Sequence, residues 1–551
     1  MHFDLVYEEI GEFGPFQKYI VLVGPLTSFY AGLLFVSTFF TLAIPDHRCA
    51  LPGWANDTYS IQSLAHFEAV NSSIPPADAD EKYIYDQCNL RYTDADGNKR
   101  LRPCHAWVYD KSIFQSTLAA DLNMVCDQSL MKSNAQMTFF GGLLVGSLMT
   151  GVASDRYGRK RTLVISSIFY FVAALSIAWT PGFIVYLIQT FCVGFFSVGN
   201  FMPVYVLCME FVGPSYRRIA GLIGGFHWLF GNLALGALGY GIRDWVTLQI
   251  VTASPGILFQ LWWWFFPESP RWLFMQGRLA ESEAIIRKAA RWNKTSLPDG
   301  FFLKVFQTTP EPNQAQIWHL FRNRTLGLRT LIVFFNWFAV CLAYYGLTLN
   351  SGDLGGDLYV NFFLTTLMDL PASLACILLL ERTGRKPLLV GGMITGGVGC
   401  LSTVFTIIYG GKDPEYETAT RILALIGKFG ASVGFTMAYM YSGEFFPTVV
   451  RNAGMGSSSC MARVGGILAP YIADLDRLVG GSFGHALPQI VFGALSLTAG
   501  ILALYLPETR GRKLPETIEQ GIKFGSEEIE YSPKEAIVNQ AFDGQEENTK
   551  L

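Results

Sequence analysis

Twelve stretches of this chain are apolar over lengths that would carry an α-helix across the hydrocarbon core of a bilayer. Only 15% of the residues are charged, whereas soluble proteins average about 25%, so lipid rather than water is the indicated solvent. We therefore predict an all-α membrane protein with twelve transmembrane helices. The predicted spans are roughly 20–44, 135–153, 162–180, 183–208, 219–241, 246–266, 330–350, 358–380, 387–409, 418–442, 453–475 and 485–506.

Three charged signatures occur twice, in the same order, and each falls where an apolar stretch ends. Each second copy follows its first by roughly 226 to 240 residues, which indicates a tandem duplication of a six-helix unit. Two such pseudo-symmetric bundles with a cavity between them are the architecture of a secondary transporter. The paired copies are DRYGRKR at 155–161 with ERTGRK at 381–386, EFVGPSYR at 210–217 with EFFPTVVR at 444–451, and PESPR at 267–271 with PETR at 507–510.

The Lys/Arg distribution orients the predicted helices. Basic residues of the short loops lie mainly on the side of the signatures, which places the signatures and both chain ends in the cytoplasm. The first apolar stretch ends in Ile-Pro-Asp rather than a small-residue cleavage site, so we predict that it is retained. The predicted division is a cytoplasmic N-terminus at 1–19, a first bundle at 20–266 with an extracellular loop domain at 45–132, a cytoplasmic linker with short helices at 267–329, a second bundle at 330–506, and a disordered cytoplasmic tail at 507–551.

The segment 45–132 is too polar to span and has the features of an extracellular domain. It holds four cysteines, Cys49, Cys88, Cys104 and Cys126, an even number that predicts two disulfides with three connectivities left open. It also carries the sequons of Asn56 and Asn71, which are predicted to be N-glycosylated. The sequons of Asn293 and Asn323 fall on the cytoplasmic side, where we predict that they are not used.

No motif of an enzyme or a pump stands out. The chain lacks a phosphate-binding loop, a zinc-binding His-Glu-x-x-His and a nucleophile elbow. We therefore predict that it is not an enzyme and that it holds no metal and no cofactor, apart from a coupling Na⁺ or H⁺, which stays open. The net charge of −3 gives no sign of a nucleic-acid partner. The predicted partners are the lipid bilayer and a small substrate; a monomer suffices, and an oligomer is also compatible.

The charges of the signatures are predicted to form a cytoplasmic gate. Opposite charges at the inner mouths of different helices would hold the two halves together while the site faces out, and separate when it faces in. Partly exposed pairs contribute about 1 kcal/mol or less each, which suits a gate that opens within milliseconds. The alternative is that these charges only set the topology. The predicted gate residues are Asp155, Arg159, Glu210, Arg217, Glu268, Arg271, Glu381, Arg385, Glu444 and Arg451.

Three charges, Asp369, Lys428 and Arg463, lie inside spans of the second half at a similar depth near the midplane. Charges are costly in lipid and usually face a cavity, so we predict that the three belong to one substrate site or network. One positive charge is left over, which favours a substrate with a carboxylate, while Asp369 is available for an amine or a coupled cation. An internal ion pair that merely neutralises itself is the alternative.

Residues of other spans complete the predicted substrate site, because aromatic faces attract quaternary ammonium groups. For each aromatic residue, packing between helices is the alternative. The additional predicted site residues are Tyr344, Tyr345, Tyr205, Gln189 and Trp228.

Four stretches resemble the organic cation/anion/zwitterion transporter family of the major facilitator superfamily. The large cysteine-bearing loop after the first span is similar to that family as well, whereas sugar porters share two of the signatures but lack such a loop. The resemblance covers essentially the whole chain except the tail, and it implies alternating-access transport in the plasma membrane. The stretches are STLAADLNMVC at 116–126, DRYGRKR at 155–161, PESPRWL at 267–273 and EFFPTVVRN at 444–452.

Departures from the pattern bear on the substrate. Family members specialised for cations tend to have an acid where this chain has Arg463, and members that handle anions or zwitterions such as carnitine tend to have arginine. The runs GKFG at 427–430 and YYGLTLN at 344–350 look like the carnitine branch, although the loop has four cysteines where many relatives have six. We predict a small organic cation or zwitterion as substrate, with an organic anion exchanger as the alternative and a sugar porter as the less favoured one.

Overall fold

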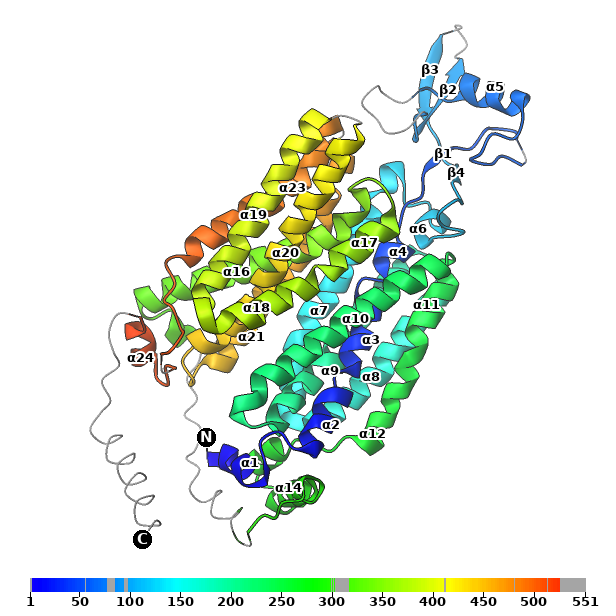
Figure 1. The fold of residues 1–551 in the computed structure, drawn as a ribbon. Coiled ribbons are helices and arrows are strands. Elements are labelled where there is room, and N and C mark those ends of the chain that lie inside the picture. Colours follow the sequence, from blue (N-terminus) through cyan, green and yellow to red (C-terminus); the bar gives the residue numbers. More distant parts are fainter. Residues whose placement is uncertain are drawn as a thin grey trace.

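The computed structural model describes residues 2–525, apart from 55, 77–84, 94–97, 299, 301, 303–316, 411–412, 480 and 513. Most of the predicted tail at 507–551 lies outside the described residues. Long helices of the two sequence halves form two sets that pack side by side (Figure 1). Ten helical segments of the described part are long and apolar enough to cross a membrane.

The first set contains residues up to the third signature. Its first span is interrupted at Pro25, and its sixth bends through 3-10 turns at Ser254–Leu261, where Pro255 supplies no backbone donor. The helices are α2 (Pro15–Val23), α3 (Leu26–Phe35), α4 (Thr38–Thr41), α7 (Leu130–Tyr157), α8 (Arg159–Ser176), α9 (Phe183–Phe211), α10 (Arg217–Gly241), α11 (Trp245–Ala253) and α12 (Trp262–Phe265).

The second set repeats this pattern. Its second span is divided at Met368, so that Asp369 begins a new helix. The predicted span at 453–475 is a continuous helix, α21, that carries Arg463 and several glycines and serines. The helices are α16 (Arg324–Leu349), α17 (Leu358–Leu367), α18 (Asp369–Thr383), α19 (Arg385–Gly410), α20 (Pro414–Phe445), α21 (Arg451–Ala473), α22 (Leu475–Val479) and α23 (Gly481–Ala503).

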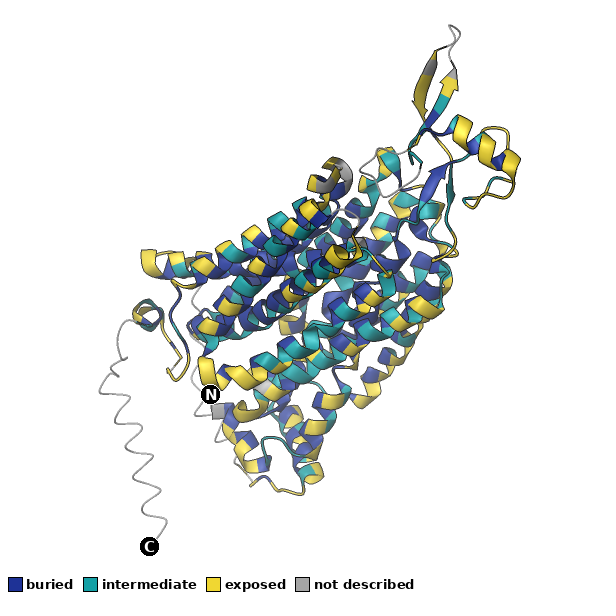
Figure 2. Cartoon of the chain, turned by 45° about the horizontal axis from the view of Figure 1, so that its top comes forward, coloured by how far each residue is buried: buried dark blue, intermediate teal, exposed yellow. Residues whose placement is uncertain are grey.

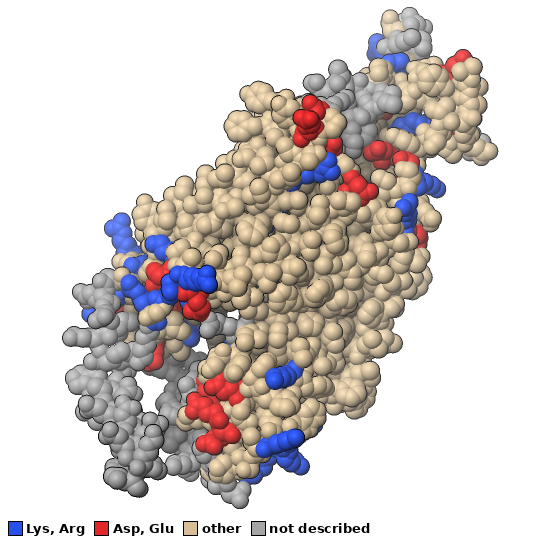
Figure 3. Space-filling model, viewed as in Figure 1, with Lys and Arg blue, Asp and Glu red and all other residues tan. Residues whose placement is uncertain are grey.

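The outer surface of the helix sets is apolar. Large side chains such as Leu148, Phe169 and Ile184 are exposed there, whereas buried residues concentrate where helices face one another (Figure 2). On the face drawn in Figure 3, charged side chains gather towards the two ends of the molecule, with a broad uncharged surface between them. Such a surface is stable only in contact with lipid.

The two halves meet at one end of the molecule, which we call the loop end because it carries the segment 45–132; the opposite end, with the three signatures, is the signature end. Lys132 on α7 pairs with Asp474, which follows α21, at 3.1 Å from Nζ to Oδ1. Ser133 donates a hydrogen bond to the other carboxylate oxygen at 2.6 Å. The ring of Phe40 lies 4.9 Å from that of Phe362 across the boundary. Polar and apolar contacts therefore close the loop end.

Short helices cover each half at the signature end. They are α1 (Leu5–Ile10), α13 (Pro270–Met275) and α14 (Leu279–Asn293) on the first half, and α24 (Ile518–Lys523) on the second. In Figure 1, α1 and α24 stand apart, whereas α4 and α17 lie close together at the loop end. The helix α14 occupies the segment for which the sequence predicts a short linker helix.

The start of the chain is fixed to the signature end of the first half. The carboxylate of Asp4 lies 2.6 Å from the guanidinium of Arg217 and 3.5 Å from that of Arg271. The Tyr7 hydroxyl donates to the backbone carbonyl of Glu210 at 2.6 Å. The buried side chains around these contacts are Phe3, Val6, Tyr7 and Ile10. Residues before the first span are thus part of the folded structure.

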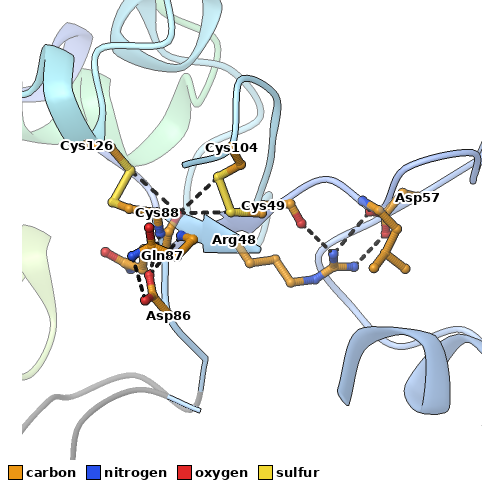
Figure 4. Close-up of a disulfide and its surroundings, with 10 residues drawn as sticks. Arg48, Cys49, Asp57, Asp86, Gln87, Cys88, Cys104 and Cys126 are labelled. Atoms are coloured by element: carbon orange, nitrogen blue, oxygen red, sulfur yellow. Dashed lines mark hydrogen bonds and ion pairs between the residues drawn. A yellow bond between two sulfur atoms is a disulfide. The ribbon is translucent and has the colours of Figure 1, made fainter. Parts of the chain in front are cut away.

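The described part of the loop domain contains two small antiparallel sheets, β1 (His47–Cys49) with β4 (Trp107–Tyr109) and β2 (Asn89–Thr93) with β3 (Lys99–Pro103), and the short helices α5 (Leu64–Ser73) and α6 (Leu118–Asp121). Two disulfides hold them together (Figure 4). Among the three connectivities left open by the sequence, the structure has Cys49–Cys104 and Cys88–Cys126.

A buried ion pair adds to the loop domain. Arg48, which is 2% exposed, donates to both carboxylate oxygens of Asp57 at 2.6 and 3.1 Å (Figure 4). Burial raises the pKa of Asp57, but hydrogen bonds from Arg48 and the Leu51 amide outweigh it and hold the pKa below the ordinary value. The pair therefore stabilises the domain at neutral pH, and this contribution is lost as the pH falls through the lowered pKa.

The surroundings of the four sequons lead to a prediction on glycosylation. Asn56 and Asn71 are exposed, whereas Asn293 donates to the carbonyl of Ile10 at 2.9 Å and Asn323 caps α16. We expect a glycosidase-sensitive mass shift that disappears in the Asn56→Gln/Asn71→Gln double variant and stays in Asn293→Gln and Asn323→Gln. Gel mobility before and after glycosidase treatment measures it, and a shift that survives the double variant would contradict the predicted orientation.

Candidate functional site

A carboxylate stands at the break in the second span of the second half. Asp369 is the first residue of α18, and its two oxygens accept hydrogen bonds from the Tyr344 hydroxyl and the Ser432 hydroxyl, both at 2.6 Å. The ammonium of Lys428 lies 4.0 Å from the same carboxylate. Residues of α16, α18 and α20 thus meet at Asp369.

Lys428 is held by groups other than the carboxylate as well. Its side chain is 2% exposed, and its ammonium donates to the Thr348 hydroxyl at 2.8 Å and to the Tyr344 carbonyl at 3.3 Å. It also lies 3.2 Å from the centre of the Tyr344 ring, a cation–π contact. The negative and the positive charge therefore satisfy each other inside the protein, with 14% of the Asp369 side chain still exposed.

Arg463 is the charge that this network leaves out. It is 5% exposed, with Tyr439, Tyr345 and Cys341 near it, and within the described part of the chain no carboxylate lies within ion-pair distance of it. Its Nε atom is buried without a hydrogen-bond partner in the described part of the chain. A buried guanidinium without an acid is costly, so the structure offers a place for an anionic group from outside the chain.

Aromatic rings connect the two charged groups. The Tyr344 and Tyr345 rings are 5.2 Å apart, and Phe435 lies 5.0 Å from Tyr344 and 5.5 Å from Tyr439. Tyr439 in turn is one of the groups nearest to Arg463. A continuous set of aromatic rings thus extends from Asp369 towards Arg463.

The first half contributes to this aromatic surface. Phe35 stacks on Tyr345 at 5.1 Å and lies 5.0 Å from Trp228. Tyr205, 44% exposed, lies within electrostatic reach of Tyr439 across the boundary. Tyr344, Tyr345 and Trp228 therefore lie close together where the two halves meet.

Gln189 is the exception among the predicted site residues. Its side-chain amide donates to the backbone carbonyl of Ser176 at 2.9 Å, near the end of α8. It precedes Tyr205 on α9 by roughly four turns, which is about 24 Å of helix. The structure does not bring it to the cluster, and its role is to tie two helices together.

At the signature end, the first signature makes the same turn in both halves. Gly158 and Gly384 have φ values of 102° and 100°, which residues with a side chain rarely adopt. The helix that follows each glycine is capped by an acid of the third signature: Glu268 accepts from the amides of Arg159 and Lys160, and Glu508 from those of Arg385 and Lys386, at 2.9–3.1 Å. Glu508 was not among the predicted residues, although the repeat PETR marks its position.

The remaining predicted gate charges pair within their own half in this conformation. Arg159 lies 3.2 Å from Glu210 and 3.1 Å from Asp155, and Arg385 lies 3.0 Å from Glu444 and 3.9 Å from Glu381. Arg217 and Arg271 are bound by Asp4, as described above. Arg451 donates to the carbonyl of Phe446 at 3.2 Å. The two halves are therefore joined at the loop end and at the central aromatic rings, not through these pairs.

The chain is similar to known transporters over most of its length. The family model described as "Sugar (and other) transporter" matches residues 92–520. The chain is 36% identical over 539 residues to the organic cation transporter protein of Drosophila melanogaster, with 95% of each chain covered. It is 31% identical over 577 residues to the organic cation/carnitine transporter 2 of Homo sapiens, with 100% of this chain and 99% of that one covered.

Solved structures agree on the fold. The partially occluded, inward-open xylose transporter XylE from E. coli matches with a TM-score of 0.60 at 16% identity, covering 92% of this chain and 100% of that one. The inward-open form of the same transporter matches with a TM-score of 0.59, covering 90% of this chain and 97% of that one. At such low identity the likeness reports the arrangement of the helices.

Proposed function

The chain belongs to the sugar (and other) transporter family and, within it, to the organic cation transporters, and on this basis we propose that it moves small zwitterionic or cationic amines, carnitine-like in chemistry, across the plasma membrane by alternating access. The single observation that carries the substrate class is Arg463, which is buried and has no acid beside it among the residues that the structure describes. A substrate carboxylate supplies the missing partner.

The aromatic surface accounts for the other end of such a substrate. Tyr345, Phe435 and Tyr439 lie between the guanidinium and Asp369, and aromatic faces bind quaternary ammonium groups. The part of Asp369 that remains exposed gives an amine a negative charge to approach. A betaine laid along the rings would thus meet a positive charge at one end and a negative charge at the other.

A plain organic anion is the second candidate substrate. Its support is that Lys428 already neutralises Asp369, so that the charge of the cluster is that of Arg463. A sugar is less favoured, because neutral hydroxyls do not require three buried charges. The uptake experiment described below also tests whether transport is coupled to Na⁺ or H⁺.

The two ends of the molecule support alternating access. The Lys132–Asp474 pair and the Phe40–Phe362 contact close the loop end between the halves, while α1 and α24 stand apart at the signature end (Figure 1). We infer that the signature end and both chain ends face the cytoplasm and that the conformation faces inward. Opening outward then breaks the loop-end contacts and brings the signature ends together.

Uptake of labelled solutes by cells expressing the protein tests the proposal. The panel contains carnitine, tetraethylammonium, an aryl carboxylate, β-alanine and glucose, measured in sodium or lithium buffer at several pH values. We expect saturable uptake of carnitine, weaker uptake of tetraethylammonium and none of glucose. Uptake confined to the aryl carboxylate would support an organic anion as the substrate, and uptake confined to glucose would overturn the proposal.

Arg159 and Arg385, the arginines of the first signature in the two halves, are expected to affect the rate of transport. We expect Arg159→Ala and Arg385→Ala each to lower the maximal uptake rate about fivefold to tenfold, with little change in the half-saturation concentration. The reason is distance: Arg385 follows Asp369 by roughly four helical turns, about 24 Å, so it affects opening rather than binding. Initial rates over a range of substrate concentrations, corrected for surface expression, measure both parameters.

The matched control is Arg156→Ala, which removes an exposed arginine of the same signature. That variant should transport at the wild-type rate. A large rise in half-saturation concentration at an unchanged maximal rate in Arg159→Ala or Arg385→Ala would contradict a role in gating.

A further inference from the structure

The duplication allows two equivalent lysines to be compared. Lys160 and Lys386 both follow the arginine of the first signature, and the amide of each donates to the acid that caps its helix. Their side chains have different neighbours. The ammonium of Lys160 lies 4.9 Å from the centre of the Trp263 ring, whereas the third signature aligns Trp263 with Ala503 in the second half. The first half thus carries a feature that the duplication alone does not explain.

The neighbours of Lys160 combine positive charge with exposed aromatic surface. Lys288, on α14, is exposed and lies within electrostatic reach of Lys160. The acid nearby is Glu268, whose carboxylate already accepts hydrogen bonds from the amides of Arg159, Lys160 and Ser269. Lys160 therefore has a second ammonium group near it, while the carboxylate beside it already accepts three amide hydrogen bonds.

The aromatic residues mark where the lipid boundary lies. Trp263, Trp264 and Phe265 form the end of the sixth span and are 47%, 72% and 58% exposed. Tryptophan is enriched at the level of the lipid headgroups, where its ring is in contact with both acyl chains and polar groups. The helix α14, with Lys288, lies just beyond this boundary. The two lysines are therefore at headgroup depth rather than in the aqueous loops.

We propose that Lys160, Lys288 and Trp263 bind the headgroup phosphate of an anionic phospholipid in the leaflet at the signature end. This is the cytoplasmic leaflet in the orientation proposed above, but the site does not depend on what the protein transports. The two ammonium groups balance the charge of the lipid, and its acyl chains run along Trp264 and Phe265. Basic pockets between membrane helices on the cytoplasmic side bind anionic lipids in the same manner.

Lipid binding to the purified full-length protein tests the proposal. The protein is placed in nanodiscs of phosphatidylcholine with a minor fraction of phosphatidylserine, and the lipids that stay bound after extraction are counted by native mass spectrometry. We expect wild type to retain phosphatidylserine in preference to phosphatidylcholine. Lys160→Gln/Lys288→Gln should lose this preference by about fivefold for each lysine removed.

The matched control is Lys386→Gln, which removes the equivalent lysine of the second half and should leave the preference unchanged. Lys288→Gln alone, on an exposed position of a helix outside the spans, should lose about fivefold even if the double variant fails to fold. Equal retention of both lipids by wild type, or an equal loss in Lys386→Gln, would overturn the proposal. Inorganic phosphate should not displace the bound lipid; displacement would show a site for free anions instead.

Discussion

Replacing Arg463 with alanine should abolish uptake of a betaine and spare the cation obtained by esterifying its carboxylate. The guanidinium is buried and has no acid among the described groups that act on it, so in wild type a substrate carboxylate would be its partner. Without it, that carboxylate enters the buried cluster unpaired, which costs about 2–5 kcal/mol, or roughly thirtyfold or more in uptake. The ester should be transported as well as before or better, because a repulsive positive charge has gone.

The matched pair makes this result specific. Initial uptake of a betaine and of its neutral-ester cation is measured in wild type, Arg463→Ala and Arg463→Lys, at equal surface expression. Lysine should restore betaine uptake only in part, because it cannot form the two parallel hydrogen bonds that a guanidinium forms with a carboxylate. Equal losses for both members of the pair would mean that Arg463 supports the fold, and the zwitterion proposal would fall with it.

A large loss of stability is expected when either partner of the buried Asp369–Lys428 pair is replaced. Asp369→Asn leaves the ammonium of Lys428 without its anion, and Lys428→Gln leaves the carboxylate without its cation. Removing one partner of a buried pair typically costs about 3–5 kcal/mol. The double variant removes both charges together, so its loss of stability should be clearly smaller than the sum of the two single losses. Thermal unfolding of the purified protein in detergent measures the four members of the cycle.

A second ion pair of the same chain is the control for this cycle. Arg278 and Glu281 lie 2.6 Å apart, but their side chains are 39% and 58% exposed. The same cycle on that pair should give a coupling energy below about 1 kcal/mol, because water replaces the lost partner. If the losses of stability in Asp369→Asn and Lys428→Gln were additive, the two charges would be independent. Lys428 would then not neutralise Asp369, contrary to the proposed site.

Much of the architecture follows from patterns that are local in sequence. Lipid leaves a helix as the only stable form of a long apolar stretch outside a closed barrel, which is why the expected spans, such as 183–208 within α9, correspond to helices. The duplicated signatures add the relation between the halves. The predicted fold class, an all-α membrane protein of two helix bundles in the major facilitator arrangement, is confirmed by the match to solved transporters.

Pairing between distant residues is what the sequence does not reveal. Arg217 and Arg271 belong to signatures, and nothing in their spacing identifies Asp4, more than two hundred residues away, as their partner. In the same way, the sequence does not reveal that the Gln189 amide is used by the carbonyl of Ser176. Depth in the membrane can be counted along a helix, but the direction of a side chain depends on the neighbouring helices.

One signal in the sequence would have extended the site. Lys428 lies on α20, and residues four, seven and eleven positions later fall on the same helix face. These are Ser432, Phe435 and Tyr439, which bind Asp369, stack against Tyr344 and contact Arg463. Following the face of a helix from one charged residue would thus have found three more members of the cluster.

The docked N-terminus has a practical consequence for anyone who labels this protein. Phe3 and Val6 are buried and Asp4 is bound to two arginines, so a fluorescent protein or affinity tag joined directly to the first residues would compete with these contacts. A reporter attached after the last residue leaves them intact. Localisation and uptake studies that fuse a reporter at the N-terminus therefore risk describing a transporter whose first half has been loosened by its own label.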